Sequence, residues 1–342
     1  MSDQKTSTLL ALSLLFTPIA VPAVTPSRPQ TISPSTISET TPRASVRRMK
    51  HQLATAPLLQ AKGTYVGELQ ERWQFPSDHL PIAMTYDDLH IASWNVLDAG
   101  YMSWVTEKNS QGLSRSLIKD EHIYIGDSKL TIRDIHTADL VLEMISHPTH
   151  PRSILSLQEC SKPFLEELTS RLSGSFEVVE HHGNAILFDR SRFELVNAKE
   201  VLGVFTNEPK RSFQEICLRR IDNGENFKLF NVHLPGDPTK PGRFEFAQYI
   251  KDTFDSNCTT VAMGDMNFNE LEMADAMRQA FPDNSPFSIY SPYCTNISPY
   301  VFNSKAIDHF IISTPNQSLV TLNSPDQVMT KLEEVVSLLE RL

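Results

Sequence analysis

Short apolar runs alternate along most of this chain with stretches in which apolar residues recur at helical spacing. The apolar runs have the length and residue types of β-strands, and they lie at residues 80–86, 89–96, 153–157, 176–179, 185–188, 213–218, 227–232, 259–263 and 307–312. Helical periodicity covers residues 137–145, 163–172, 243–254, 270–280 and 327–342. Strands and helices interleave here without strict strand–helix alternation, which predicts an α+β or layered α/β domain.

The N-terminal part of the chain lies outside this pattern. Residues 1–24 carry an apolar centre that is typical of an export signal, but it is short for a membrane span and contains Pro18 and Pro22. We therefore expect export or secretion, with a tail on a cytoplasmic protein as the alternative. Residues 25–60 are rich in Ser, Thr and Pro and are expected to form a linker.

These boundaries leave one folded domain, at residues 65–313, followed by a helical C-terminal extension at 314–342. Within the domain, residues 100–135 are a long polar insertion with no predicted structure. We expect the protein to be a monomer, with membrane contact only through its N-terminal segment.

Composition and charge narrow the classes of function. Of the 342 residues, 40% are hydrophobic and 21% are charged, which is enough to build a substantial core. The net charge of -10 argues against a general electrostatic grip on nucleic acid. It allows a metal-dependent enzyme acting on phosphate esters, because bound cations reverse the local charge. The 4 cysteines are widely spaced and form no C-x-x-C pair, so neither a zinc site nor a dense disulfide framework is expected.

Polar side chains follow several predicted strands at the point where each strand ends. Asp265 and Asn267 come directly after the buried run 259–263 and Gly264, and alternation along an extended chain puts them on one face. A carboxylate beside an amide oxygen suits a hard cation or a phosphoryl group, although such a pair is also common in turns.

Further polar residues occupy similar places at Asn95, Gln158, Glu159, Asn231, His233 and Asp308. Burying a carboxylate without a partner costs several kcal/mol. Repeated acids on apolar strands therefore predict a shared cation or a basic partner.

Together these stretches resemble the endonuclease/exonuclease/phosphatase superfamily, the DNase-like phosphoesterases, from about Phe75 to Ser313. The motifs that carry the resemblance are Trp94-Asn95, Gln158-Glu159, Asn231-Val-His233, Gly264-Asp-Met-Asn267 and Ile307-Asp308. The resemblance implies a four-layer α/β/β/α sandwich. The stretch from Trp94 to Tyr101 is similar to the deadenylase-like branch of the superfamily.

The chain departs from the family at the motif that carries the family's essential histidine. Family members end with a Ser-Asp-His-x-Pro stretch, whereas here Ser77-Asp-His-Leu-Pro-Ile82 stands before the first family strand. This order indicates a circular permutation that moves the final family strand to the N-terminal side. Residues 80–86 and 89–96 would then pair as a hairpin with a turn at Asp87 and Asp88. The alternative is that Ser77-Asp-His is an incidental loop.

The resemblance also implies a ligand set for a divalent cation. Glu159 would be the principal ligand of Mg²⁺, or alternatively Mn²⁺, with help from Asn95 and Asp78. Oxygen ligands with little sulfur or imidazole favour Mg²⁺ over Zn²⁺.

Catalytic roles follow from the same resemblance. His79 would act as general base or phosphate contact, oriented by Asp308. Asp265 would position or activate the attacking water, Asn267 would bind a phosphate oxygen, and His233 would stabilise the pentavalent state or protonate the leaving group.

Three further residues complete the expected site. Arg211 is a candidate phosphate clamp, with a solvated surface arginine as the alternative. Asn184 stands where the family's DNase-like branch has an acid that orients the second histidine. His309 is expected to point to the opposite face and to be structural.

The predicted function is metal-dependent hydrolysis of a phosphodiester in nucleic acid or a nucleotide, by in-line attack of an activated water. The acidic net charge and the lack of a basic-aromatic stripe keep a phosphoinositide or another small phosphate ester as the alternative substrate. A catalytically silent binding module is the alternative of another class.

Overall fold

A computed structural model describes residues 76–98, 101, 130–237, 239, 241–283, 285–291, 306–315 and 320–329. The predicted signal segment, the linker and most of the 100–135 insertion lie outside these residues. None of the helices in the described ranges is long and apolar enough to cross a membrane.

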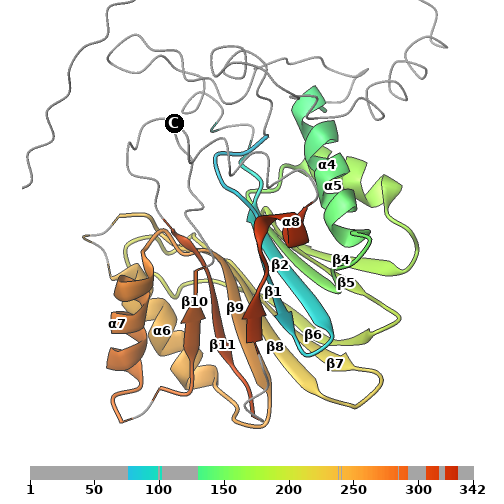
Figure 1. The fold of residues 1–342 in the computed structure, drawn as a ribbon. Coiled ribbons are helices and arrows are strands. Elements are labelled where there is room, and N and C mark those ends of the chain that lie inside the picture. Colours follow the sequence, from blue (N-terminus) through green and yellow to red (C-terminus); the bar gives the residue numbers. More distant parts are fainter. Residues whose placement is uncertain are drawn as a thin grey trace, which may run out of the picture. The chain divides into compact units, whose positions relative to one another are not determined.

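Two six-stranded mixed sheets form the centre of the domain (Figure 1). The first has the strand order β12 (Val320–Leu322), β1 (Ile82–Tyr86), β2 (Leu89–Asn95), β3 (Ile154–Gln158), β5 (Asn184–Asp189) and β4 (Phe176–His181). The second has the order β10 (Ser288–Tyr290), β11 (Asp308–Ser313), β9 (Thr259–Asp265), β8 (Asn226–His233), β7 (Phe213–Arg220) and β6 (Phe193–Val201).

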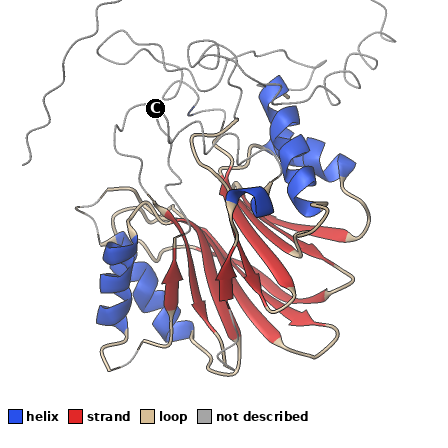
Figure 2. Cartoon of the chain, viewed as in Figure 1, coloured by secondary structure: helices blue, strands red, loops and turns tan. Residues whose placement is uncertain are grey.

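The helices cover the outer faces of the two sheets, as Figure 2 shows. The helices are α4 (Ile132–Ile145), α5 (Lys162–Arg171), α6 (Gly242–Thr253), α7 (Glu270–Ala280) and the short α8 (Pro325–Val328). One apolar cluster joins α4 and α5 to the first sheet, a second lies between the sheets, and a third joins α6 and α7 to the second sheet. Three apolar interfaces separate four layers, so the predicted α/β/β/α sandwich is confirmed.

Side chains of a strand point alternately to its two faces, so a single strand contributes to two of these interfaces. In β2, Leu89 and Ile91 pack between the sheets, whereas Ala92 and Trp94 pack under the helices. A strand that is buried on both faces reads as a nearly continuous apolar run, which is why these strands are visible in the sequence.

The predicted hairpin is present. β1 and β2 are antiparallel with Tyr86 opposite Leu89, and Asp87 in the turn adopts a φ of 51°. β2 is parallel to β3, and β8 is parallel to β9. Parallel neighbours end at the same edge of a sheet, so their C-terminal residues are brought together there.

Three strands are absent from those that the apolar pattern predicts. β6 is long but largely exposed, and its pairing with β7 is irregular between Leu195 and Asn197. β10 and β12 are edge strands of 3 residues each. Too few of their positions are buried to produce a periodic signal.

The boundary predicted at residue 313 needs correction. β12 pairs with β1, and Val328 and Met329 lie in the apolar cluster under α4 and α5. The described part of the 314–342 segment therefore belongs to the sandwich, and the rest of its predicted helix lies outside the described residues. α4 begins at Ile132, inside the predicted insertion, where Thr131 and Asp134 form a capping box.

Candidate active site

Side chains from both sheets converge at one edge of the sandwich. Asn95, His233 and Asp265 are the last residues of β2, β8 and β9. Asp308, the first residue of β11, lies opposite Asp265 because β11 is antiparallel to β9. Side chains two residues apart in a strand point to the same face of the sheet. Each of these residues therefore faces the same way as the residues of its strand that pack between the sheets, as Asp265 does with Met263 in β9. The site is therefore the polar end of the inter-sheet space.

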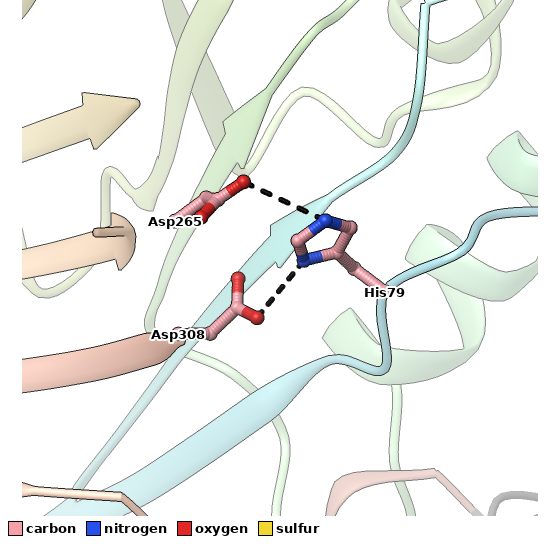
Figure 3. A group of neighbouring side chains, drawn as sticks. All are labelled: His79, Asp265 and Asp308. Atoms are coloured by element: carbon pink, nitrogen blue, oxygen red, sulfur yellow. Dashed lines mark hydrogen bonds and ion pairs between the residues drawn. The ribbon is translucent and has the colours of Figure 1, made fainter. Parts of the chain in front are cut away.

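His79 lies between two carboxylates (Figure 3). Its Nδ1 is 2.9 Å from Asp308 Oδ2, and its Nε2 is 3.5 Å from Asp265 Oδ2. Burial lowers the pKa of His79, but the charges of Asp308, Asp265 and Asp78 outweigh burial and raise that pKa well above its usual value. The imidazolium form is thereby favoured, with both nitrogens carrying protons.

The segment that carries His79 is fastened to β2. The Trp94 indole donates to the His79 carbonyl oxygen at 2.9 Å, and Ser77 Oγ donates to the Asn95 carbonyl oxygen at 2.6 Å. Ser77 Oγ also accepts from the His79 N–H at 3.0 Å. The Ser77-Asp-His motif is thus held in the site by the Ser77 hydroxyl and by the backbone of His79.

Arg133, in the first turn of α4, is a supporting residue that the sequence prediction missed. Its Nη1 donates to the carbonyl oxygens of Pro76 at 2.9 Å and Val96 at 2.8 Å. Burial lowers the pKa of Arg133, while the acids Asp134 and Asp98 oppose that change. An arginine inside a polar insertion carries no sequence signal that separates it from a solvated one.

Glu159 lies close to His233, Asp265 and Asn95, which form a second group of side chains beside His79. Its Oε1 is 3.5 Å from His233 Nε2, and that nitrogen is 3.7 Å from Asp265 Oδ2. The Asn95 amide nitrogen donates to Glu159 Oε1 at 2.9 Å and to Asp265 Oδ2 at 3.1 Å. Glu159 adopts a φ of 57°, a backbone conformation that is uncommon outside glycine.

The carboxylates of the site differ in their tendency to ionise. Burial acts to raise the pKa of Glu159, but His233 and the hydrogen bonds from Asn95 and the Asp98 N–H lower it below its usual value. For Asp265 burial is the larger effect and its pKa is raised, although His79 opposes the shift. Glu159 is therefore more firmly ionised than Asp265.

The donor set fits a hard divalent cation. Asp78 Oδ1 is buried and has no hydrogen-bond partner, and burial raises the pKa of this carboxyl. Ligand atoms of Glu159, His233 and Asp265 lie within 4.8 Å of one another. A cation held by this group would neutralise its acids, and the donors are mostly oxygen. Asp78 lies outside the group, with its Oδ1 3.9 Å from His79 Nε2.

Asn95 is oriented differently from a direct ligand in this arrangement. Its side-chain oxygen accepts from the Leu97 N–H at 3.0 Å, and its nitrogen faces the two carboxylates. Asn267 lies beside Asp265, whose Oδ1 accepts from the Asn267 N–H at 2.9 Å, and the Asn267 amide donates to the Leu234 carbonyl oxygen at 2.8 Å.

An open pocket of about 880 Å³ adjoins the cluster, with Glu159 and His233 in its wall. Arg211 lines this pocket, donates to Glu208 Oε2 at 3.0 Å and donates to the His233 carbonyl oxygen at 3.2 Å. Asn184 is buried in the same wall. No hydrogen bond joins Asn184 to His233 in the described part of the chain.

The remaining strand-end residues lie away from the site. The Gln158 amide donates to Asn231 Oδ1 at 2.8 Å in the space between the sheets, so both residues support the site without entering it. His309 points to the outer face, with its Nε2 2.6 Å from the Phe268 carbonyl oxygen, as its structural interpretation predicts.

No protein-family model matches the chain, and no curated protein matches its sequence. A solved endonuclease/exonuclease/phosphatase family protein from Bacteroides thetaiotaomicron is similar over 69% of this chain and 83% of its own, with 15% identity and a TM-score of 0.46. The human Nocturnin catalytic domain is similar over 70% of this chain and 96% of its own, with 18% identity and a TM-score of 0.41.

A mannosyl-6-phosphatase from Bacteroides thetaiotaomicron VPI-5482 is similar over 68% of this chain and 98% of its own, with 15% identity and a TM-score of 0.44. All three TM-scores are below 0.5 and all three identities are below 25%, so function must be argued from the site.

Proposed function

We propose that this chain is a divalent-metal-dependent phosphoesterase that hydrolyses a phosphodiester in nucleic acid or a nucleotide. One observation carries the proposal. Two overlapping groups, His79–Asp265–Asp308 and Glu159–His233–Asp265, meet at the open end of the inter-sheet space. Clustered acids with two imidazoles suit a reaction in which negative charge must be neutralised and water activated.

Glu159, with Asp78 and Asn95, would hold the cation, and Mg²⁺ is favoured over Mn²⁺ as the proposed ion. When bound, it would neutralise charge on the phosphate. The orphaned Asp78 oxygen and the ionised Glu159 carboxylate support this assignment. Asn95 would need to present its oxygen, which in the described arrangement faces the Leu97 N–H.

The raised pKa of His79 and its place between two carboxylates support the role of phosphate contact over that of general base. An imidazolium between Asp308 and Asp265 has no free nitrogen to accept a proton, so His79 would contact a phosphate oxygen as a hydrogen-bond donor. Asp265 would then orient the attacking water and accept its proton, since burial and Asp308 raise the pKa of this carboxyl.

His233 would stabilise the pentavalent phosphorus or protonate the leaving oxygen. Its Nε2 faces Glu159 and Asp265. Asn267 would bind a phosphate oxygen, and Arg211 would clamp the substrate from the pocket wall.

We also propose that the chain is a circular permutant of the DNase-like fold. The β1–β2 hairpin supports this proposal, because it delivers His79 to the site from the N-terminal side of the first strand. Export through residues 1–24 and a monomeric state remain predictions.

A small phosphate ester, such as a phosphoinositide, is the second candidate substrate. The pocket beside Glu159 favours it, because about 880 Å³ lies within the range of small-ligand sites, roughly 300–1,000 Å³.

The test is a hydrolysis assay of the full chain with Mg²⁺ and then with EDTA, on plasmid DNA, poly(A) RNA, phosphoinositides and bis-p-nitrophenyl phosphate. We expect cleavage that EDTA abolishes, that Asp265→Asn loses, and that the matched exposed variant Asp252→Asn retains. A folded protein that cleaves nothing, and whose melting temperature Mg²⁺ does not raise, would instead be a binding module.

A further inference from the structure

The pocket beside the cluster extends to residues that no catalytic role uses. Besides Glu159 and His233, its wall contains His182, Glu200 and Lys210. These residues come from the β4–β5 turn, the end of β6 and the loop after β6. A group attached to the scissile phosphate would therefore meet them next.

Glu200 faces the first sheet. It pairs with Gln214 across β6 and β7, and the Gln214 amide donates to the Val179 carbonyl oxygen at 2.8 Å on the inner side of the sandwich. Directly paired residues share a face, so Glu200 is directed the same way. On the opposite wall, His182 Nε2 lies 3.1 Å from Glu200 Oε2.

The second carboxylate oxygen of Glu200 is unsatisfied. Glu200 Oε1 is buried and has no hydrogen-bond partner. Such an atom is costly to leave unpaired, and a ligand that donates a hydrogen bond to it would remove that cost. The wall already supplies one partner to this carboxylate, through His182, and Lys210 is exposed nearby. The wall carries acids, among them Asp98 and Glu159, as well as the bases Lys210 and Arg211, so its charge does not require a cationic ligand, and a neutral hydroxyl can donate to Oε1.

Building on the phosphoesterase function above, we propose that this pocket binds a sugar of the substrate and that Glu200 accepts a hydrogen bond from a sugar hydroxyl. Asn184, buried in the same wall, is placed to add a second polar contact. The substrate class is then a nucleotide or another sugar phosphate, and Glu200 sets specificity without taking part in the chemical step.

Calorimetric titration of the full chain in Mg²⁺ tests this directly, with uridine 5′-monophosphate and phenyl phosphate as probes. The wild type is expected to bind the nucleotide at least about tenfold more tightly than phenyl phosphate, as a hydrogen bond to a charged group predicts. Glu200→Met removes the acceptor and should weaken nucleotide binding by about tenfold to a hundredfold, while phenyl phosphate affinity changes less than about threefold.

His182→Gln is the matched control, because it breaks the same ion pair and leaves the carboxylate in place. It should keep the preference for the nucleotide. If Glu200→Met does not fold, two other variants replace it. Glu200→Gln retains an acceptor of the same shape, and it should lose less affinity for the nucleotide than the double variant His182→Ala with Glu200→Ala.

Equal affinity for the two probes, or an equal loss of both in Glu200→Met, overturns the sugar site. This readout needs no turnover, so it separates the two proposals. An inactive protein that prefers the nucleotide through Glu200 keeps the sugar site and refutes the enzyme. An active protein without that preference keeps the enzyme and refutes the sugar site.

Discussion

Replacing Gly264 with alanine tests the backbone packing that brings β9 against β8 beside Asp265. Gly264 adopts a φ of 137°, and a Cβ at this position would lie 2.1 Å from the Val232 carbonyl oxygen of the neighbouring strand. Ordinary contact between heavy atoms requires about 3.5 Å, so either β8 or β9 must move.

Alanine substitutions at two other glycines separate the energetic cost of the backbone conformation from the cost of the steric clash. Gly224 has a φ of 75° but open space around its Cβ position, so Gly224→Ala measures the left-handed backbone alone, about 1–2 kcal/mol. Gly174 has open space and no positive φ, so Gly174→Ala should change the free energy of unfolding by less than about 1 kcal/mol. Overpacking against a backbone atom adds about 1–3 kcal/mol, which puts the cost of Gly264→Ala at about 2–5 kcal/mol.

Urea unfolding of the full chain at neutral pH, followed by tryptophan fluorescence, gives the three free energies of unfolding. The expected order of destabilisation is Gly264→Ala well above Gly224→Ala, and Gly224→Ala above Gly174→Ala. If the free energies of unfolding of Gly264→Ala and Gly224→Ala differed by less than about 1 kcal/mol, the tight approach of β8 and β9 would be refuted.

Three further predictions concern the site and the opposite end of the sheets. Asp308→Asn should lower kcat on bis-p-nitrophenyl phosphate by about a hundredfold or more with little change in KM, because His79 loses the carboxylate that orients it and raises its pKa. Arg133→Met should lower the free energy of unfolding in urea by about 2 kcal/mol or more, since it removes both hydrogen bonds that Arg133 Nη1 donates and leaves the Pro76 and Val96 carbonyl oxygens without them. Burial, aided by Arg152, lowers the pKa of His90 to about 4, so the folded state resists its protonation and loses stability as pH falls from about 6.5 towards 4. His90→Gln should remove about 1 kcal/mol of that loss, a figure reduced for solvent screening of the partly exposed ring, and unfolding at pH 7 and pH 4.5 would measure it.

The parts of the fold that could be predicted are those whose burial leaves a periodic signal. β9 is buried at every position and follows from its apolar run, and α7 follows from its spacing and the capping box of Asn269 and Glu272. β12 could not be predicted, because a short edge strand is specified by its partner β1 rather than by its own residues.

The candidate site divides in the same way. Acids at the ends of apolar strands, such as Glu159 and Asp265, are visible because burial makes them costly and therefore informative. Arg133 and Glu200 are not, because one lies in a polar insertion and the other in a half-exposed strand where charged residues are ordinary. Only the three-dimensional structure distinguishes Arg133 and Glu200 from solvated residues.

The site depends on contacts between the sheets as much as on its own residues. Asn95 and Glu159 come from the first sheet, whereas His233 and Asp265 come from the second. Asn231 in β8 holds the sheets together just behind them: its amide donates to the carbonyl oxygens of Leu157 at 2.9 Å and Ala185 at 3.1 Å, and its oxygen accepts from Gln158.

Because both carbonyl oxygens belong to the opposite sheet, their hydrogen bonds fix the spacing and the register between the layers. Apolar side chains fill most of the rest of this interface, and they tolerate sliding better than directed hydrogen bonds do. A buried polar network close to the converging acids therefore accounts for how residues from two separate sheets can meet within hydrogen-bonding distance, as Asn95 and Asp265 do at 3.1 Å.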